Sequence, residues 1–551
     1  MNTARSEPQI AIIGLGPTGL MLAHLLARRG LTVTVLERDH AFYGRARAVY
    51  TDDECLRIFQ MAGIAGDLMA DMIHDSAAQW VLPDGRVLAQ YRQNERPNHW
   101  PVMNFLYQPW LETKMEALLA PQPGVTLMRG REVTGFAQDD AGVTITHQPT
   151  GGGEAVSLRA DWLIACDGGR SATRKALGIE MAGASYPERW LVLDLKVQDA
   201  DETLRHLPYF GFVCDPAQPV VCCPQPGGHH RFEFLLRRDQ DAAEMEHPEK
   251  IRELLSRFID PGRAEILRSL VYTFNALNAA QWRKGRVLLA GDAAHMTPQF
   301  MGQGMSAGLR DAANLAWKLD LACNGRATDR LLDSYQAERR PHVQAMIFVS
   351  VQMMRFVSVS KPWLAICRNA AVRLALVTPV LSGWLRRAGF KPKPVIRAAR
   401  WAGLPRRGLA RAAGRLIPQP ELRDFRGRLA PLDDHLGPGF ALMGLGCDPL
   451  AYLAPDIRER WEGLGLRSLT LWPAGGRPQS IREVPGKTMA TTELEDPRDS
   501  LYRWLRRHGA RQGSVVVIRP DRFIATTAAA ADIDNASRDL FSRMALTGTL
   551  P

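Results

Sequence analysis

Two glycine-lined segments, far apart in the chain, have the residue types and spacing needed to bind a nucleotide. The first is Gly14-x-Gly16-x-x-Gly19, which follows an apolar run at Ile10–Ile13 and opens a helical pattern. Glycines at this spacing permit a tight turn, close approach of backbone to a pyrophosphate, and close packing of the helix on a sheet. The unpaired N–H groups at the helix start would then face the phosphate charge. This stretch therefore predicts a dinucleotide site.

An acidic residue stands where the ribose of such a nucleotide would lie. Glu37 ends the second apolar run, which we predict as a strand at 32–36. A carboxylate there accepts hydrogen bonds from a ribose diol and repels a 2′-phosphate, which favours FAD or NAD over NADP. We also expect Pro17, Thr18 and Arg38 to contact the cofactor.

The second glycine-lined segment decides between these two cofactors. Asp292 directly follows the apolar run "VLLAG", and the loop Pro298–Gly304 then opens a helix predicted at 305–323. A doubly wound NAD dehydrogenase completes its site within one sheet, whereas FAD carries a ribityl chain and a flavin ring that a second segment must hold. Taken singly, Asp292 could be a helix cap and the glycines turn residues. We expect the second segment to contact FAD through Gly291, Asp292, Gly302, Gln303, Gly304 and Met305.

Length and composition indicate a globular protein of two or three domains. The 551 residues are 46% hydrophobic and 23% charged, and the apolar region 346–384 is broken by arginine and lysine, which favours packed helices over a membrane span. The start of the sequence has no apolar run of signal-peptide type, so we expect a cytoplasmic protein. Eight scattered cysteines form no C-x-x-C and no zinc spacing, so we predict reduced thiols and no metal site.

The net charge of +11 comes from one segment. Between Arg386 and Arg428 the sequence has 13 Lys and Arg against 2 Asp and Glu, and many Pro and Gly. We interpret it as a solvated linker, although contact with an anionic partner or a membrane surface would also explain it. Because the excess is local, the charge does not predict nucleic-acid binding.

Three motifs together resemble the FAD-dependent aromatic hydroxylases, the single-component flavoprotein monooxygenases typified by p-hydroxybenzoate and phenol hydroxylases. They are the first glycine motif with Glu37, "CDGGRSATRKALG" from Cys166, and "GDAAH" from Gly291. The resemblance implies that Asp167 and Gly168 serve the FAD pyrophosphate and the passage of the nicotinamide donor.

The same resemblance implies three further site residues. Arg47 and Gln108 match positions at which the family contacts its flavin cofactor, with Arg45 as a rival for the arginine. Pro298 occupies the place of a flavin-facing proline, so Asp292 and Pro298 are the residues expected nearest the chemistry.

Longer stretches resemble the 3-(3-hydroxyphenyl)propionate hydroxylase branch of that family, for example "LLDSYQAERRPHVQAMI". The resemblance implies hydroxylation of a phenol ortho to its hydroxyl, with O2 and with NADH or NADPH as co-substrate. A different phenol or an aromatic polyketide stays open as the substrate, because the flavin loop "PQFMGQGMSAG" departs from the branch. A flavin oxidase or a non-catalytic flavin-binding protein would also carry these cofactor motifs. A disulfide reductase would need a paired cysteine motif that the sequence lacks.

The expected fold is α/β: a Rossmann-like FAD-binding domain, an inserted mixed β-sheet substrate domain, and a C-terminal thioredoxin-like domain without C-x-x-C. We place the FAD-binding domain at 1–185 and 276–385, the substrate domain at 186–275, the basic linker at 386–430 and the last domain at 431–551. The last domain would pack or form dimers, which leaves a homodimer open. Polar candidates for the substrate pocket are His206, Tyr209, Arg231 and Tyr272.

Overall fold

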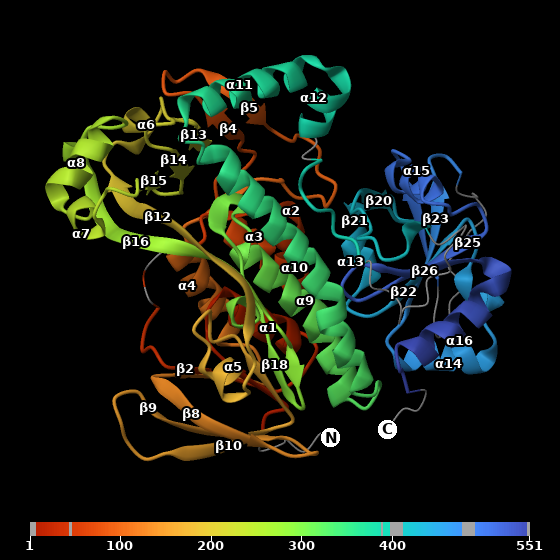
Figure 1. Cartoon of the computed structure of the whole chain (residues 1–551). Helices are drawn as coiled ribbons and strands as arrows, with labels where there is room; N and C mark the ends of the chain where they lie inside the picture. The colour runs from red at the N-terminus through yellow and green to blue at the C-terminus, as the bar shows by residue number, and fades with distance from the viewer. Residues whose placement is uncertain are drawn as a thin grey trace.

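The computed structural model describes residues 7–42, 44, 47–386 (without the side chain of 386), 389–396, 411–476 and 491–547 (Figure 1). Arg45 and part of the basic linker, at 387–388 and 397–410, lie outside the described residues. The described chain forms an α/β fold with four main sheets and a small two-stranded one, β3 (Tyr50–Thr51) with β6 (Asn104–Phe105).

The first main sheet is the one that carries the glycine motif. Its strand order is β17-β18-β11-β1-β2-β7, and all neighbours are parallel except β17 and β18. The central strands are apolar on both faces because helices cover both sides, as is usual for parallel sheets. The strands are β1 (Ile10–Ile13), β2 (Val33–Glu37), β7 (Val125–Arg129), β11 (Trp162–Ala165), β17 (Arg283–Lys284) and β18 (Val287–Leu289). Strand β2, which the sequence predicts at 32–36, begins and ends one residue later than expected.

Helices from distant parts of the chain pack around this sheet. The helices that start at the two glycine-lined segments are α1 (Pro17–Ala27) and α9 (Gly304–Cys323). The long α10 (Arg330–Val357) lies beside α9 (Figure 1). The others of this half are α2 (Asp53–Ala62), α3 (Ala65–Met69), α4 (Gln108–Leu119) and α5 (Ala172–Ala176). A three-stranded antiparallel sheet, β8 (Arg131–Gln138), β9 (Val143–Pro149) and β10 (Val156–Ala160), projects from it.

The second large sheet has eight strands in the order β19-β16-β12-β15-β14-β13-β4-β5. Side chains alternate between two buried faces: one packs on α7 (Ala242–Met245) and α8 (Pro248–Ser256), and the other, called here the inner face, on α10 and the Pro298 loop. The strands are β4 (Ala78–Val81), β5 (Val87–Tyr91), β12 (Met181–Val197), β13 (Phe210–Val213), β14 (Val220–Pro224), β15 (His229–Leu235), β16 (Ala264–Ala279) and β19 (His295–Met296). Three of them, β4, β5 and β19, lie outside 186–275, so the substrate domain that we propose is not one continuous insertion.

Two helices follow α10 and pack against β5 (Figure 1). They are α11 (Pro362–Val377) and α12 (Pro379–Arg386). Of the packed helices predicted over 346–384, α11 packs on β5 through one side only, and Ala365 and Arg368 are its buried residues. Among the described residues, no single helix is long and apolar enough to cross a membrane; α10 and α11 meet those criteria only as a pair bent by 118°.

The C-terminal domain is a seven-stranded sheet in the order β21-β20-β24-β23-β22-β25-β26. Strands β22, β23 and β24 are parallel, β25 is antiparallel to β22, and β26 is antiparallel to β25, an arrangement compatible with the thioredoxin-like fold that we propose for this domain. The strands are β20 (Glu421–Arg423), β21 (Leu429–Pro431), β22 (Ala441–Leu445), β23 (Arg467–Pro473), β24 (Thr492–Asp496), β25 (Ser514–Ile518) and β26 (Ile524–Ala529). Its helices are α13 (Leu432–Leu436), α14 (Pro455–Gly463), α15 (Ser500–Arg507) and α16 (Ile533–Arg543). Because β20 and β21 both begin before 431, we propose that this domain begins no later than Glu421.

Buried ion pairs join this domain to α9 and α10. Arg519 donates to both carboxylate oxygens of Glu338, at 3.1 and 2.7 Å, and Lys318 lies 3.2 Å from the same carboxylate. A buried charge without its partner is costly, so these contacts fix one orientation of the domain.

Candidate active site

The two glycine-lined segments lie side by side, although they are far apart in the sequence. Thr18, in the first turn of α1, packs against Gly291 and against Gly308 of α9. A Cβ atom at Gly291 would lie 2.6 Å from Thr18 Oγ1, and one at Gly308 would collide with the same oxygen. Only glycine permits this approach, so both helix starts border one region.

The first glycine motif has the geometry of a dinucleotide turn. Gly14 has a φ of 102°, and a Cβ atom there would lie 2.5 Å from the Cys166 carbonyl oxygen. Gly19 packs so closely on the Gly14 carbonyl that a side chain would clash. Gly16, by contrast, has no atom within 4 Å of the Cβ position, and no side chain caps the start of α1. Open space in front of free helix N–H groups is what a pyrophosphate needs.

Glu37 lies at the end of β2, next to this turn. Its carboxylate accepts hydrogen bonds from the backbone N–H of Leu15 at 2.8 Å and of Asp39 at 2.9 Å. A carboxylate has about four acceptor positions, so ribose hydroxyls can still bind. Arg38 is exposed and lies 3.7 Å from Asp39, at the rim of the site.

The Gly291 turn is held by a residue that the sequence patterns did not single out. Asp311, fully buried in α9, accepts a hydrogen bond from the Gly291 N–H at 3.1 Å and one from Arg339 at 2.9 Å. Burial alone would raise the pKa of Asp311, but the charges of His295 and Arg339 hold it below its usual value. Asp311 therefore stays ionised and fixes the turn to the helix.

Two carboxylates at this turn retain unused acceptor atoms. Among the described residues, no hydrogen bond or ion pair engages the half-buried Asp292 carboxylate. Burial raises its pKa, against the opposing charges of His295 and Arg47. Asp167 accepts from the Thr173 N–H through Oδ2, while its buried Oδ1 has no partner. Buried acceptors are normally satisfied, so these atoms fit a polar ligand with hydroxyl groups such as FAD.

The "CDGGRSATRKALG" motif is tied to the same turn. Gly168 has a φ of 78° and nothing within 4 Å of its Cβ position. Arg174 donates to the carbonyl of Ala293 and to that of Gly169, both at 3.0 Å. All three sequence motifs thus lie around one region.

The loop from Pro298 to Gly304 forms the far end of this region. The Pro298 carbonyl accepts a hydrogen bond from Ser350 at 2.6 Å, and Gly302 has a φ of 59° that favours glycine. Gln303 accepts from Arg310 at 3.0 Å, so its side chain is used inside the protein. Helix α9 begins at Gly304, followed by the half-buried Met305, with no side-chain cap. Its free N–H groups favour a negative charge in front of the helix.

Arg47 and Gln108 lie in contact, and together they support one loop. The side-chain oxygen of Gln108 accepts from the N–H of Arg47 at 2.8 Å and of Ala48 at 2.6 Å. Gln108 therefore shapes the loop, while the charge of the exposed Arg47 partly offsets the rise that burial causes in the pKa of Asp292.

The four substrate candidates divide between the two sides of the eight-stranded sheet. Arg231 and Tyr272 are on the inner face, where Arg231 pairs with Asp194 at 2.6 Å and donates to the Arg47 carbonyl at 2.7 Å. His206 contacts the Phe258 carbonyl on the α8 side, and Tyr209 is 52% exposed. We therefore do not retain His206 and Tyr209 as substrate contacts, because the sheet separates them from the Pro298 loop.

Aromatic side chains line the inner face opposite that loop. Phe300 lies with its ring centroid 5.1 Å from Trp190 and 5.2 Å from Phe274, both at edge-on angles. Tyr50 packs against Gly302 and stacks near Phe210, with centroids 6.3 Å apart. These contacts make an apolar wall suited to an aromatic ring.

Glu233 is the ionisable group on this wall that the sequence reasoning missed. It follows Arg231 by two residues in β15, so both side chains point to the inner face. Burial raises the pKa of Glu233 to about 7, although the Arg231 charge and the Gln299 side chain oppose the rise. The alternation that selected Arg231 would also have found Glu233.

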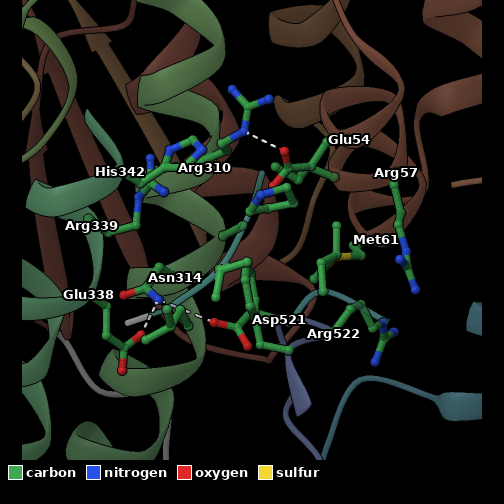
Figure 2. Close-up of a pocket in the computed structure, with 17 residues that line it drawn as sticks. Glu54, Arg57, Met61, Arg310, Asn314, Glu338, Arg339, His342, Asp521 and Arg522 are labelled. Carbon is green, nitrogen blue, oxygen red and sulfur yellow. Dashed lines mark hydrogen bonds and ion pairs between the residues drawn. The ribbon is translucent and has the colours of Figure 1, made fainter. Parts of the chain in front are cut away.

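A separate small cavity of about 30 Å³ lies between α2, α9, α10 and the C-terminal domain (Figure 2). Several of its polar side chains bind one another, for example Arg310 with Glu54 at 2.7 Å and Asn314 with Asp521 at 3.2 Å. The volume suits two or three water molecules. It therefore belongs to the domain interface and not to the cofactor region.

Two protein families match the chain. Residues 7–350 match the family described as FAD binding domain, and residues 414–543 match the HcaD C-terminal domain. The first match covers the three motifs and both sheets that border the candidate site.

Curated relatives match nearly the whole chain. The 3-(3-hydroxy-phenyl)propionate/3-hydroxycinnamic acid hydroxylase of Klebsiella pneumoniae (strain 342) is 36% identical over 521 residues, 94% of this chain and 92% of its own. The protein of the same name from Escherichia coli (strain K12) is 35% identical over 542 residues, covering 98% and 95%.

Solved structures share the fold. The flavin-dependent monooxygenase PieE, in complex with FAD and substrate, aligns with a TM-score of 0.80 at 21% identity, over 98% of this chain and 99% of its own. Aklavinone-11 hydroxylase, in a ternary complex with FAD and aklavinone, aligns with a TM-score of 0.76 at 21% identity, over 97% and 99%.

Proposed function

Because the chain belongs to the family of FAD-dependent aromatic hydroxylases, we propose that it hydroxylates a meta-substituted phenol ortho to its hydroxyl group. O2 supplies one oxygen atom to the ring and one to water, while NADH or NADPH is oxidised and one proton is consumed. The names of the relatives support a phenol with a carboxylated side chain, 3-(3-hydroxyphenyl)propionate or 3-hydroxycinnamate.

The contact of Thr18 with Gly291 and Gly308 carries the proposal, since it brings both glycine-lined helix starts to one extended ligand. The first start would hold the pyrophosphate, with Glu37 on the ribose. Asp292 and Asp167 offer free acceptors for hydroxyl groups of the ribityl chain, and the Pro298 loop would border the flavin ring. Bound FAD, reduced by NAD(P)H, supplies the activation of O2.

The inner face would hold the phenol against the Pro298 loop. Trp190, Phe274 and Phe300 exclude water from the ring, which limits loss of activated oxygen. A phenol reacts at its ortho carbon more readily once its hydroxyl proton has been removed, so a proton acceptor is needed beside the ring.

We propose Glu233 for that step. Its carboxylate is buried on the same face as Tyr272 and Arg231, and a general base works best with a pKa near the working pH. Arg231 is held by Asp194 and by the Arg47 loop, so we assign it to positioning.

A flavin oxidase is the competing function. Purified protein with FAD, assayed against a panel of phenols for stimulated NADH and NADPH oxidation with product identification, distinguishes the two. The proposal predicts a catechol product and phenol-dependent oxidation of one or both nicotinamides. Flavin reduction by the substrate alone, without a nicotinamide, would support an oxidase.

A cytoplasmic location and a homodimer stay predictions. The relatives are hydroxylases of small molecules, which supports a small-molecule substrate.

A further inference from the structure

Helices α11 and α12 expose an unusual amount of apolar surface. In α11, Trp363 is 61% exposed, Ile366 68%, Leu374 68% and Val377 76%. Their spacing of three, eight and three residues puts them along one side of the helix. In α12, Val380, Leu381 and Trp384 are exposed as well. We call these seven residues the apolar stripe.

The helix that carries the stripe is firmly attached to the protein. Arg368, one of the two buried residues of α11, donates to the Cys214 carbonyl at 3.1 Å and to the Phe356 carbonyl at 3.1 Å. This anchor holds α11 against the eight-stranded sheet. The stripe is therefore presented by an ordered helix on the side of the protein where α11 and α12 pack against β5 (Figure 1).

The charged residues of the chain segment that carries the stripe have one sign. Between Arg355 and Arg415 the sequence contains 14 Lys and Arg and no Asp or Glu. Arg355 of α10, Lys361 just before α11 and Arg373 of α11 are exposed. Exposed tryptophan and aliphatic residues flanked by cations are typical of helices that lie in the interface of an anionic bilayer.

From this combination we propose that α11 and α12 bind the surface of a membrane containing anionic lipids. The apolar stripe enters the boundary between headgroups and acyl chains, and the cations contact lipid phosphates. A second copy of the chain fits less well, because a two-fold contact would bring two purely cationic segments together. The site of attachment lies beside the sheet that borders the proposed phenol pocket.

The test uses the full-length protein with FAD and vesicles of phosphatidylglycerol or phosphatidylcholine. We expect co-sedimentation with the anionic vesicles, weaker binding to the neutral ones, and loss of binding near 1 M salt, where the Debye length falls to about 3 Å. Lys361→Glu with Arg373→Glu should weaken binding by about thirtyfold or more. Trp363→Ser with Ile366→Ser and Leu374→Ser should abolish it without changing turnover. Phe425→Ser with Arg426→Glu, an exposed aromatic–cation pair on the C-terminal domain, is the matched control.

Cys367 gives an independent readout. It is exposed on α11, while the other cysteines are buried or half-buried. An environment-sensitive dye on Cys367 should shift its emission to the blue with anionic vesicles, and Cys367→Ser provides the unlabelled control. Unchanged emission together with equal sedimentation of wild type and stripe variant would overturn the proposal. So would a wild-type dimer that the stripe variant converts to a monomer, with no vesicle binding by either.

Discussion

His295 Nε2 lies 2.6 Å from Asp311 Oδ2, and both side chains are buried. His295 is the last residue of the "GDAAH" motif, and Asp311 follows Gly308 by about one turn of α9. The contact joins the Gly291 turn to the helix whose start borders the proposed flavin site. The position of that turn therefore depends on α9.

Asp311→Asn should loosen this turn. The change leaves Arg339 without an ionised partner, and breaking a buried ion pair costs about 3–5 kcal/mol of unfolding free energy. We expect lower flavin occupancy after purification and a smaller unfolding free energy in urea. Asp320→Asn, which removes a less buried partner of Arg29 from the same helix, should have a smaller effect on flavin. Equal flavin loss in both variants would show that Asp311 has no special role.

Gly308→Ala should force α1 and α9 apart, because the new Cβ atom would collide with Thr18 Oγ1. Overpacking of this kind costs about 1–3 kcal/mol. Thr18→Ala removes the colliding oxygen, so the double variant should recover part of the stability and flavin binding. Gly66→Ala, in α3 with open space at the Cβ position, is the control. Absence of any rescue would argue against the close contact.

Glu338→Gln should weaken the attachment of the C-terminal domain. Burial on its own would raise the pKa of Glu338, but Arg519 and Lys318 lower it to about 2. Since the folded-state pKa is below the unfolded value of about 4.3, the ionised carboxylate contributes about 3 kcal/mol that is present above pH 4.3 and lost as the pH falls toward 2.

Calorimetry over this acid range checks the prediction. Wild type should lose stability below about pH 4. Glu338→Gln should already be less stable at neutral pH, and its stability should change less as the pH falls. Arg538→Ala breaks an exposed pair with Asp456 and should leave the stability nearly unchanged, because solvent screens the pair. If Glu338→Gln had wild-type stability at pH 7, the ion pair between Glu338 and Arg519 would not contribute to stability.

Glu233→Gln should remove the dependence of turnover on pH near 7. The carboxylate accepts a proton only when ionised, so with a pKa of about 7 the wild-type rate should rise as the pH increases through 7. Absorbance of the bound substrate should show more phenolate over the same range. We expect the variant to lose the rise, with kcat about a hundredfold lower or more and a smaller change in KM. Glu265→Gln, exposed on the same sheet, should keep the wild-type profile. A Glu233→Gln enzyme with an unchanged profile would assign the proton to another group.

Local patterns explain why the cofactor half of the site could be predicted. Gly14, Gly19 and Glu37 belong to one strand–helix–strand unit, whose geometry follows from short-range spacing. The pairing of this unit with the Gly291 turn followed from the size of FAD, and the contact through Thr18 agrees with it.

Long-range contacts explain what the sequence did not predict. Asp311 looks like any polar residue of an amphipathic helix until α9 is placed against the turn. His206 and Tyr209 were candidates because strand-rich sequence alone does not tell which face meets the flavin loop. The exposure of α11 could not be foreseen, because apolar helical periodicity is the same for a packed helix and for an interfacial one.

Hydrogen–deuterium exchange of the apoprotein with ADP and with FAD tests the central claim most directly. ADP should protect the amides around Gly14–Gly19 only, and FAD should protect these together with the Gly291 turn and the Pro298–Gly304 loop. Protection of the first segment alone by FAD, or none at either segment, would contradict a single cofactor held at both.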